Sequence, residues 1–140
     1  METKLRRPTN DEFCKIVKEH EKWLKDPNKG ERADFRWMDL TQVEMISADL
    51  RYADFSYSDL SHSDLRNSDF SGSVFTCVRL CGANLSGTKF VGAHMRCASM
   101  IRAKLYDTDF HNANLEFVVW KEKTNEELAK DNNIRSLGVP

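Results

Sequence analysis

The sequence predicts an all-β solenoid, in which the chain turns a corner every five residues and winds into stacked coils. Large apolar residues occupy 17 successive positions five apart, from Phe35 to Leu115, with no insertion between them. Two residues before each of these centres lies a compact or at least uncharged residue, such as Ala53 or Ser63. A helix repeats about every 3.6 residues and a strand every two, so neither keeps this spacing on one face. We therefore expect two residues of every five to point inward and three to face water.

The repeated unit occurs as "ADLRY", "ADFSY", "SDLSH", "ANLSG" and "ANLEF". This motif, A(D/N)LXX, resembles the repeat of the pentapeptide-repeat family, and the resemblance covers residues 33 to about 118. It implies a right-handed quadrilateral β-helix with four pentapeptides in each coil, so that the 17 repeats make about four coils. Coils stacked at the strand spacing of about 4.8 Å would give a shaft roughly 20 Å long.

Four pentapeptides per coil place residues 20 apart in the sequence on the same face of neighbouring coils. Stacked aromatic rings attract one another and help to fix the register, so the phenylalanines are interpreted as core. Four glycines lie two residues after a large apolar centre, where a corner can need a positive φ. The predicted stacks are Phe35, Phe55 and Phe75 on one inner face and Phe70, Phe90 and Phe110 on another, and the corner glycines are Gly72, Gly82, Gly87 and Gly92.

Residues 1–32 and 119–140 lack the repeat and are predicted to cap the two ends of the β-helix, residues 33–118. Caps are expected because the open ends of a solenoid expose unpaired backbone groups that invite aggregation. Two capping boxes predict an N-terminal helix that ends near Asp26 and a short C-terminal helix. The boxes are Thr9 with Glu12 and Thr124 with Glu127, and the N-terminal helix carries an apolar stripe of Phe13, Ile16, Val17, His20 and Leu24.

The sequence carries no arrangement typical of a catalytic or cofactor site. Catalysis needs a concave site with reactive groups in mutual reach, whereas the predicted shaft is convex and filled with side chains. The four histidines share no face, and no Gly-rich phosphate loop or Ser-His-Asp order occurs. Cys77 and Cys97 stack one coil apart at a distance that permits a disulfide, whereas zinc would need two further ligands, for which Cys81 and His94 are the nearest candidates. We expect a non-enzymatic protein with free thiols and with neither metal nor cofactor.

Charge and hydropathy argue against a membrane or nucleic-acid-binding protein. The net charge is −1, and no apolar run approaches the roughly 20 residues that span a bilayer. The first residues include basic ones but lack the apolar region of a signal peptide, so a cytoplasmic location is expected. The basic residues of the C-terminal half are few and dispersed, which argues against direct binding of nucleic acid.

An acidic residue precedes each of the first eight large apolar centres, and a mixed series follows. Residues 33–75 contain 8 acidic and 3 basic side chains, a net charge of −5, whereas residues 76–118 contain 3 and 5, a net charge of +2. One interpretation is that these acids accept hydrogen bonds from the backbone at corners. Stacked carboxylates about 5 Å apart also repel by roughly 1 kcal/mol in water, so their repetition equally indicates a binding surface. The acidic set is Asp34, Asp39, Glu44, Asp49, Asp54, Asp59, Asp64 and Asp69.

A second outward feature is an apolar column that runs along one corner. A contiguous exposed apolar stripe often marks an interface, and Trp and Tyr dominate interface energies. The alternative is that the N-terminal helix or linker covers one end of the stripe and the C-terminal segment covers the other. The column consists of Trp37, Tyr57, Cys77, Cys97 and Phe117.

The resemblance implies a binding protein, because some pentapeptide-repeat proteins imitate double-stranded DNA. The first hypothesis is therefore a DNA mimic that inhibits a DNA-handling protein, such as a topoisomerase or a defence-system nuclease complex. DNA carries one charge per about 1.7 Å of axis, whereas a protein docked on one edge of this shaft would face only about four carboxylates. The alternative hypothesis is a scaffold or dimerisation module that binds a protein, including a second copy, without imitating DNA.

Overall fold

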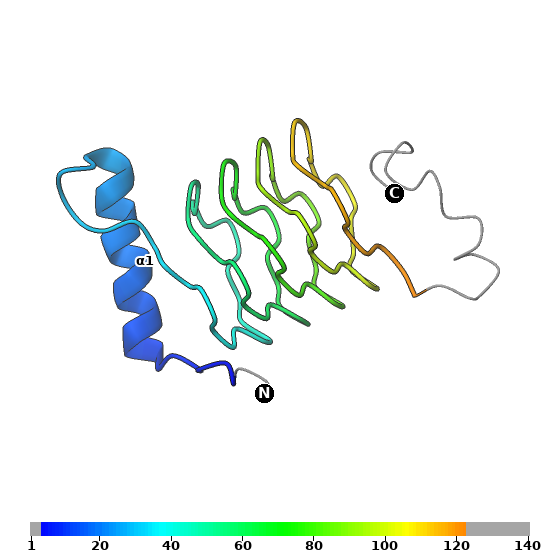
Figure 1. Cartoon of the computed structure of the whole chain (residues 1–140). Coiled ribbons are helices and arrows are strands. Elements are labelled where there is room, and N and C mark those ends of the chain that lie inside the picture. The colour runs from blue at the N-terminus through cyan, green and yellow to red at the C-terminus, as the bar shows by residue number, and fades with distance from the viewer. Residues whose placement is uncertain (1–3, 123–140) are drawn as a thin grey trace.

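The computed structural model describes residues 4–122, and Figure 1 shows a helix followed by a stack of coils. The helix is α1 (Asn10–Lys25). The β structure of the described residues consists of isolated parallel bridges, and all but the one between Arg6 and Met38 join a residue to the one 20 positions later, as in Asp34 with Asp54 or Ser99 with Val119. A coil therefore contains 20 residues, the length of four pentapeptides.

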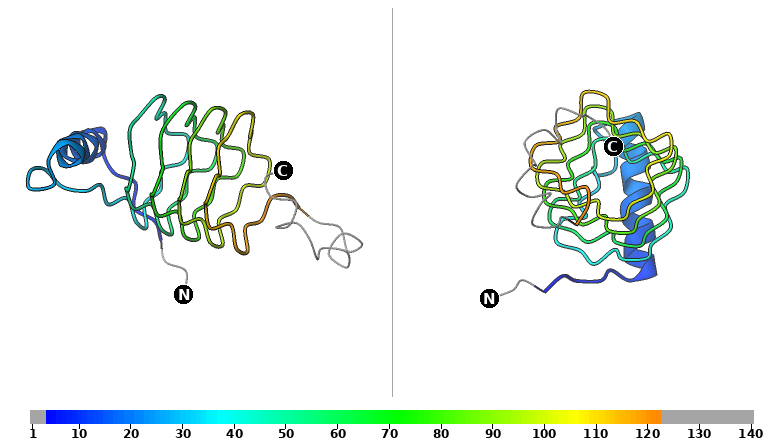
Figure 2. Two further views of the ribbon diagram at one scale, coloured as in Figure 1. Left: turned by 90° about the horizontal axis from the view of Figure 1, so that it is seen from above. Right: turned by 90° about the vertical axis from the view of Figure 1, so that its right-hand side faces the viewer.

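Corners alternate with these bridges. The residue two positions after each large apolar centre has a positive φ, between 54° and 70° at all 17 places. The carbonyl of the centre accepts the N–H of the residue three positions later, as in Phe55 and Ser58 at 3.0 Å, which closes a β-turn. With a turn in every pentapeptide, each side of a coil has room for only one bridging residue. When the stack is viewed along its axis, successive coils superpose on one another (Figure 2, right).

The large apolar centres fill the interior, and the predicted aromatic stacks are confirmed. Phe35 and Phe55 stack with ring centroids 4.9 Å apart, and Phe75 continues the column 4.8 Å from Phe55. In the second column Phe90 lies 5.5 Å from Phe70, and Phe110 extends it. Edge-to-face contacts between the two columns join them into one core.

The compact inward positions accept serine and threonine because the backbone satisfies their hydroxyls. Ser58 Oγ donates to the Phe55 carbonyl at 2.6 Å, and Thr88 Oγ1 donates to the Leu65 carbonyl at 2.7 Å. The expectation that three residues of every five face water is wrong at Ser56 and Ser61, which are both buried. These small side chains lie in columns between larger residues of the neighbouring coils, which shield them from water.

Helix α1 begins and ends as the sequence predicts and lies across the N-terminal end of the stack (Figures 1 and 2). Thr9 and Glu12 form the capping box, in which the Thr9 hydroxyl accepts the Glu12 N–H at 3.1 Å. Phe13, Ile16 and Val17 pack against the core, and the Phe13 ring lies 5.5 Å from the Phe35 ring. The helix thus covers the apolar end of the first coil.

A short segment before α1 pairs with the first coil, which the sequence analysis did not anticipate. Arg6 forms a parallel bridge with Met38, and its carbonyl accepts the Asp39 N–H at 2.9 Å. This segment covers part of the open backbone edge of the first coil. The predicted C-terminal helix, with Thr124 and Glu127, lies outside the described residues. Within residues 4–122, no helix has the length and apolar character needed to cross a bilayer.

Candidate partner-binding surfaces

The seven aspartates of the acidic set brace the corners that follow them. In each case the carboxylate accepts the N–H of the residue two positions later, at 2.9–3.4 Å. Asn84 and Asn114 make the same contact with an amide oxygen, at 3.1 and 3.0 Å. The side chain at this position therefore has a structural role that needs an acceptor oxygen but no charge.

Arginine side chains lie within 3.5 Å of half of the acidic set. Arg36, Arg51 and Arg66 each follow an aspartate by two residues and form a forked pair with it, at N–O distances of 2.7–2.9 Å. These hydrogen bonds hold the pKa of each paired aspartate below its usual value. Arg7 lies 3.5 Å from Asp39 as well. The forked aspartates are Asp34, Asp49 and Asp64.

The rest of the acidic set does not form one patch. Asp54 lies 3.9 Å from Arg36, and Glu44, Asp59 and Asp69 have no ion pair among residues 4–122. The bridges place these last three residues in three different columns, and hence on three different sides of the shaft. A partner docked on one side would meet only one of these three carboxylates.

The apolar column forms an exposed ridge, called the aromatic ridge below. Trp37 and Tyr57 stack with ring centroids 4.5 Å apart and planes 9° from parallel, yet their exposed fractions are 46% and 42%. Phe117 is 56% exposed at the other end, where the Arg96 guanidinium lies 4.9 Å from the ring centroid. The ridge consists of Trp37, Tyr57, Cys77, Cys97 and Phe117, of which the two cysteines are half-buried.

The other three corners are interrupted by glycine, and side chains of the preceding coil fold onto it. A Cβ atom at Gly72 would lie 2.5 Å from the ring of Tyr52, and one at Gly87 would lie 2.1 Å from Asn67 Oδ1. Because the ridge corner has no glycine, its side chains continue without a gap from the first coil to Phe117. The ridge corner therefore differs from the other three corners because it has no glycine and because its row of side chains is uninterrupted.

Helix α1 does not cover the ridge, so that part of the alternative interpretation is wrong. The helix contacts the end of the stack and a different corner, where Trp23 lies 6.5 Å from Tyr52. The segment before the helix pairs with the backbone beside Trp37, but the indole remains half-exposed. The C-terminal segment that was expected to cover Phe117 lies outside the described residues.

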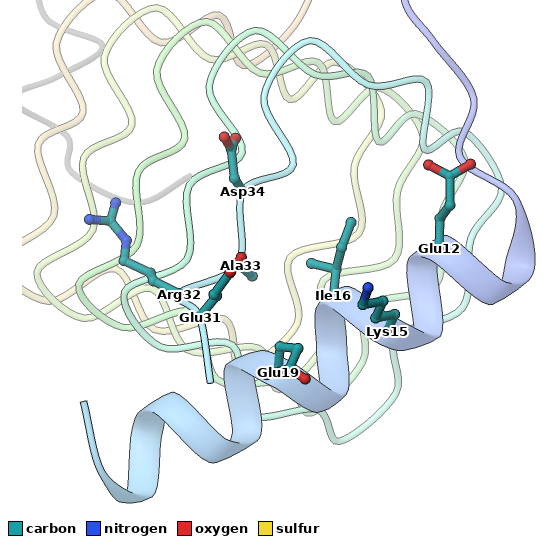
Figure 3. Close-up of a pocket in the computed structure, with 8 residues that line it drawn as sticks. All are labelled: Glu12, Lys15, Ile16, Glu19, Glu31, Arg32, Ala33 and Asp34. Atoms are coloured by element: carbon teal, nitrogen blue, oxygen red, sulfur yellow. The ribbon is translucent and has the colours of Figure 1, made fainter. Parts of the chain in front are cut away.

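A pocket of about 360 Å³ lies between α1 and the first coil (Figure 3). Its Glu12 carboxylate is already bonded to Arg6 and to the cap of the helix. Within residues 4–122, no group of three or more metal-ligating side chains could hold a metal ion. The pocket is lined by Glu12, Lys15, Ile16, Glu19, Glu31, Arg32, Ala33 and Asp34.

The sequence model of the pentapeptide repeats matches residues 31–67, 53–90 and 79–116, with eight copies of the repeat. The chain belongs to the pentapeptide-repeat family. Proteins of this family are generally structural or binding proteins without catalytic activity. No curated protein is significantly similar to the chain in sequence.

Several solved pentapeptide-repeat structures resemble this one at low identity. A protein from the Arabidopsis thaliana thylakoid lumen is 20% identical, with a TM-score of 0.44, over 69% of this chain and 75% of that one. HetL, from Nostoc sp. strain PCC 7120 and involved in heterocyst differentiation regulation, is 20% identical, with a TM-score of 0.47, over 65% of this chain and 56% of that one. QnrB1, a plasmid-mediated fluoroquinolone resistance protein, is 15% identical, with a TM-score of 0.36, over 79% and 72%.

Proposed function

We propose that this protein is a non-enzymatic protein-binding module that uses the aromatic ridge as its contact surface. The observation that carries the proposal is the stacked and half-exposed pair of Trp37 and Tyr57, which α1 leaves uncovered. Aromatic side chains fixed in one conformation lose little entropy on binding and supply large contact areas. The stack on adjacent coils holds both rings in place before any partner arrives.

A second copy of the chain is the partner that the charge distribution favours. Residues 33–75 have a net charge of −5 and residues 76–118 a net charge of +2. Two copies that pair their ridges in opposite directions place the acidic half of each against the basic half of the other. A two-fold axis near Cys77, the midpoint of the ridge, would set Trp37 of one copy opposite Phe117 of the other.

Substitution of Tyr57 by Glu tests the ridge. Sedimentation velocity over a range of concentrations should show dimers of the unmodified protein, and their affinity should fall as salt is raised. Tyr57→Glu should weaken dimerisation by at least about tenfold, or roughly 1.4 kcal/mol, because it buries a charge in the interface. Circular dichroism should be unchanged, since the side chain lies outside the core.

Tyr106→Glu is the matched control, because Tyr106 is 77% exposed and lies in a different column. It should dimerise as the unmodified protein does. Dimers that persist in Tyr57→Glu would exclude the ridge as the contact surface. A protein that stays monomeric at every concentration would exclude the second copy as the partner.

DNA mimicry is the second candidate, and the unpaired carboxylates favour it. Glu44, Asp59 and Asp69 have no ion pair among residues 4–122, so they remain available for basic side chains of a DNA-handling protein. The forked arginine pairs argue against DNA mimicry, because they neutralise three other members of the acidic set within the protein. A mimic would hold its target mainly through charge, and DNA would compete for the same site.

Two triple variants distinguish mimicry from corner bracing in a DNA gyrase supercoiling assay. If the protein is a mimic of the DNA that gyrase binds, it inhibits supercoiling, and the inhibition weakens with salt. Changing the unpaired residues (Glu44→Gln, Asp59→Asn, Asp69→Asn) should then reduce inhibition about tenfold or more, whereas the fork-paired control (Asp34→Asn, Asp49→Asn, Asp64→Asn) should reduce it less. Equal inhibition by both variants, or none by the unmodified protein, would contradict mimicry of gyrase DNA.

A further inference from the structure

Two cysteines occupy equivalent corners of adjacent coils. Cys77 and Cys97 are 20 residues apart and have nearly the same φ, 55° and 64°. Their N–H groups donate to the carbonyls of Arg96 and Glu116, both at 2.9 Å, so each residue is held in the stacked ladder. Because the backbone geometry repeats, both side chains leave the shaft in the same direction. Coils stacked about 4.8 Å apart bring the Cα atoms within the range of about 4.4–6.8 Å that disulfides span.

The two thiols share one environment and are not bonded to each other in this structure. Both are half-buried between the rings of the ridge, and both are free thiols. Burial raises the pKa of the Cys77 thiol. The charge of Cys97 and a hydrogen bond between the two thiols raise this pKa further. The other cysteines are not in such an arrangement, because Cys14 lies on α1 and Cys81 Sγ contacts the Ser99 hydroxyl at 3.3 Å.

We propose that Cys77 and Cys97 form a reversible disulfide between adjacent coils, with a small-molecule disulfide of the glutathione type as the oxidant. One of the two cysteines, as its thiolate, attacks one sulfur of glutathione disulfide, the S–S bond breaks, and one glutathione thiolate leaves. The other cysteine then loses its proton to solvent and attacks the sulfur of the first cysteine, which releases the second glutathione. Two protein thiols are oxidised and one glutathione disulfide is reduced to two thiols, so atoms and electrons balance.

Only the thiolate attacks a disulfide, and the raised pKa of Cys77 keeps that thiol protonated near neutral pH. Formation of the link should therefore become faster as pH rises. The two coils are already held together by bridges, corner turns and side-chain packing, and the disulfide would add a covalent link between them. The stability of the solenoid would therefore depend on the thiol redox state. The inference does not rest on the proposed dimer, which would enclose both thiols in its contact surface, so it concerns the monomeric protein.

Peptide mapping of the full chain tests the proposal directly. The lysines and arginines place Cys77, Cys81 and Cys97 on separate tryptic peptides, residues 67–79, 80–89 and 97–102. After treatment with glutathione disulfide, neither peptide of this pair should carry glutathione, and intact Cys14→Ser/Cys81→Ser, which lacks the other thiols, should weigh about 2 Da less than its reduced form. A digest without reductant should contain residues 67–79 joined to residues 97–102, and dithiothreitol should separate them.

Two variants serve as controls. Cys14→Ser/Cys81→Ser should form the same link, because it retains both stacked thiols. Cys97→Ser should form no link and should retain one glutathione on Cys77 at most. The oxidised protein should also unfold at a higher urea concentration than the reduced one, and this difference should be absent in Cys97→Ser.

Three results would overturn the inference. The first is recovery of both peptides as separate glutathione adducts, which would mean that the thiols cannot reach each other. The second is a link between residues 67–79 of two different chains, and the third is a link that includes Cys81.

Discussion

An aspartate directly before a large apolar centre holds the next corner, because its carboxylate accepts the N–H two residues further on. Asparagine makes the same contact at position 84, so an amide oxygen is sufficient. Stacked carboxylates repel one another, and Arg36, Arg51 and Arg66 relieve this where they fork onto their aspartates. These three arginines recur two residues after an aspartate in the printed sequence, so the pairing was visible there. The net charge of the segment does not show this pairing of aspartate with arginine.

Phe75 tests the core at the scale of a single residue. Its ring is fully buried and lies 4.8 Å from Phe55 and 5.2 Å from both Phe70 and Phe90. Phe75→Ala should lower the free energy of unfolding by about 3–5 kcal/mol, because it leaves a cavity between stacked coils. Urea denaturation followed by circular dichroism would measure the loss. Ser71→Ala, at a partly exposed position, should change stability by almost nothing, and equal losses in both would contradict the assignment of inward and outward positions.

At the scale of elements, α1 is attached to the first coil by a buried histidine as well as by apolar contacts. His20 Nδ1 accepts the Ala33 N–H at 2.9 Å, and Nε2 lies 2.9 Å from the Arg51 carbonyl. Both contacts together require a neutral ring with its proton on Nε2. Burial lowers the pKa of His20, and the hydrogen bond to Arg51 opposes that change in part. Sequence analysis placed His20 only in an apolar stripe, since periodicity cannot show which backbone groups a ring will meet.

His20 should therefore make the protein less stable in mild acid. The unfolded chain takes up a proton at this residue near pH 6.5, whereas the folded protein takes it up only at lower pH. Between these two pKa values the unfolded state binds more protons, so the free energy of unfolding should fall as pH drops below about 6.5. The aspartates with lowered pKa would add their own loss only below about pH 4. Urea unfolding measured from pH 7.5 to 5 would show the first effect separately.

Two glutamine variants assign this pH dependence. His20→Gln should be less sensitive to pH between about 7.5 and 5, since it has no proton to bind. His111→Gln should keep the pH dependence of the unmodified protein, because its ring is exposed. If both variants retained the full dependence, the two hydrogen bonds of His20 would not be its cause.

For the whole molecule, local periodicity predicts most of the architecture, because every coil repeats the same corner chemistry. The aromatic stacks and the positive φ at Gly72 and Gly87 follow directly from residue spacing. The bridge between Arg6 and Met38 does not, since it uses backbone groups that every residue has. The ridge was visible as a column, but its exposure depends on where α1 lies across the end of the stack. That placement is a tertiary contact with no counterpart in the spacing.

The 20-residue pairing also limits how such a chain can change in length during evolution. Loss of residues 61–80 would leave each later side chain on its original side, with Tyr57 now beneath Cys97. Loss of residues 61–65 would turn everything that follows by a quarter of a coil, so that Cys77 would lie over Tyr52 and the ridge would break in two. Viable insertions and deletions should therefore come as whole turns of the shaft, even though the pentapeptide is the visible unit of the sequence.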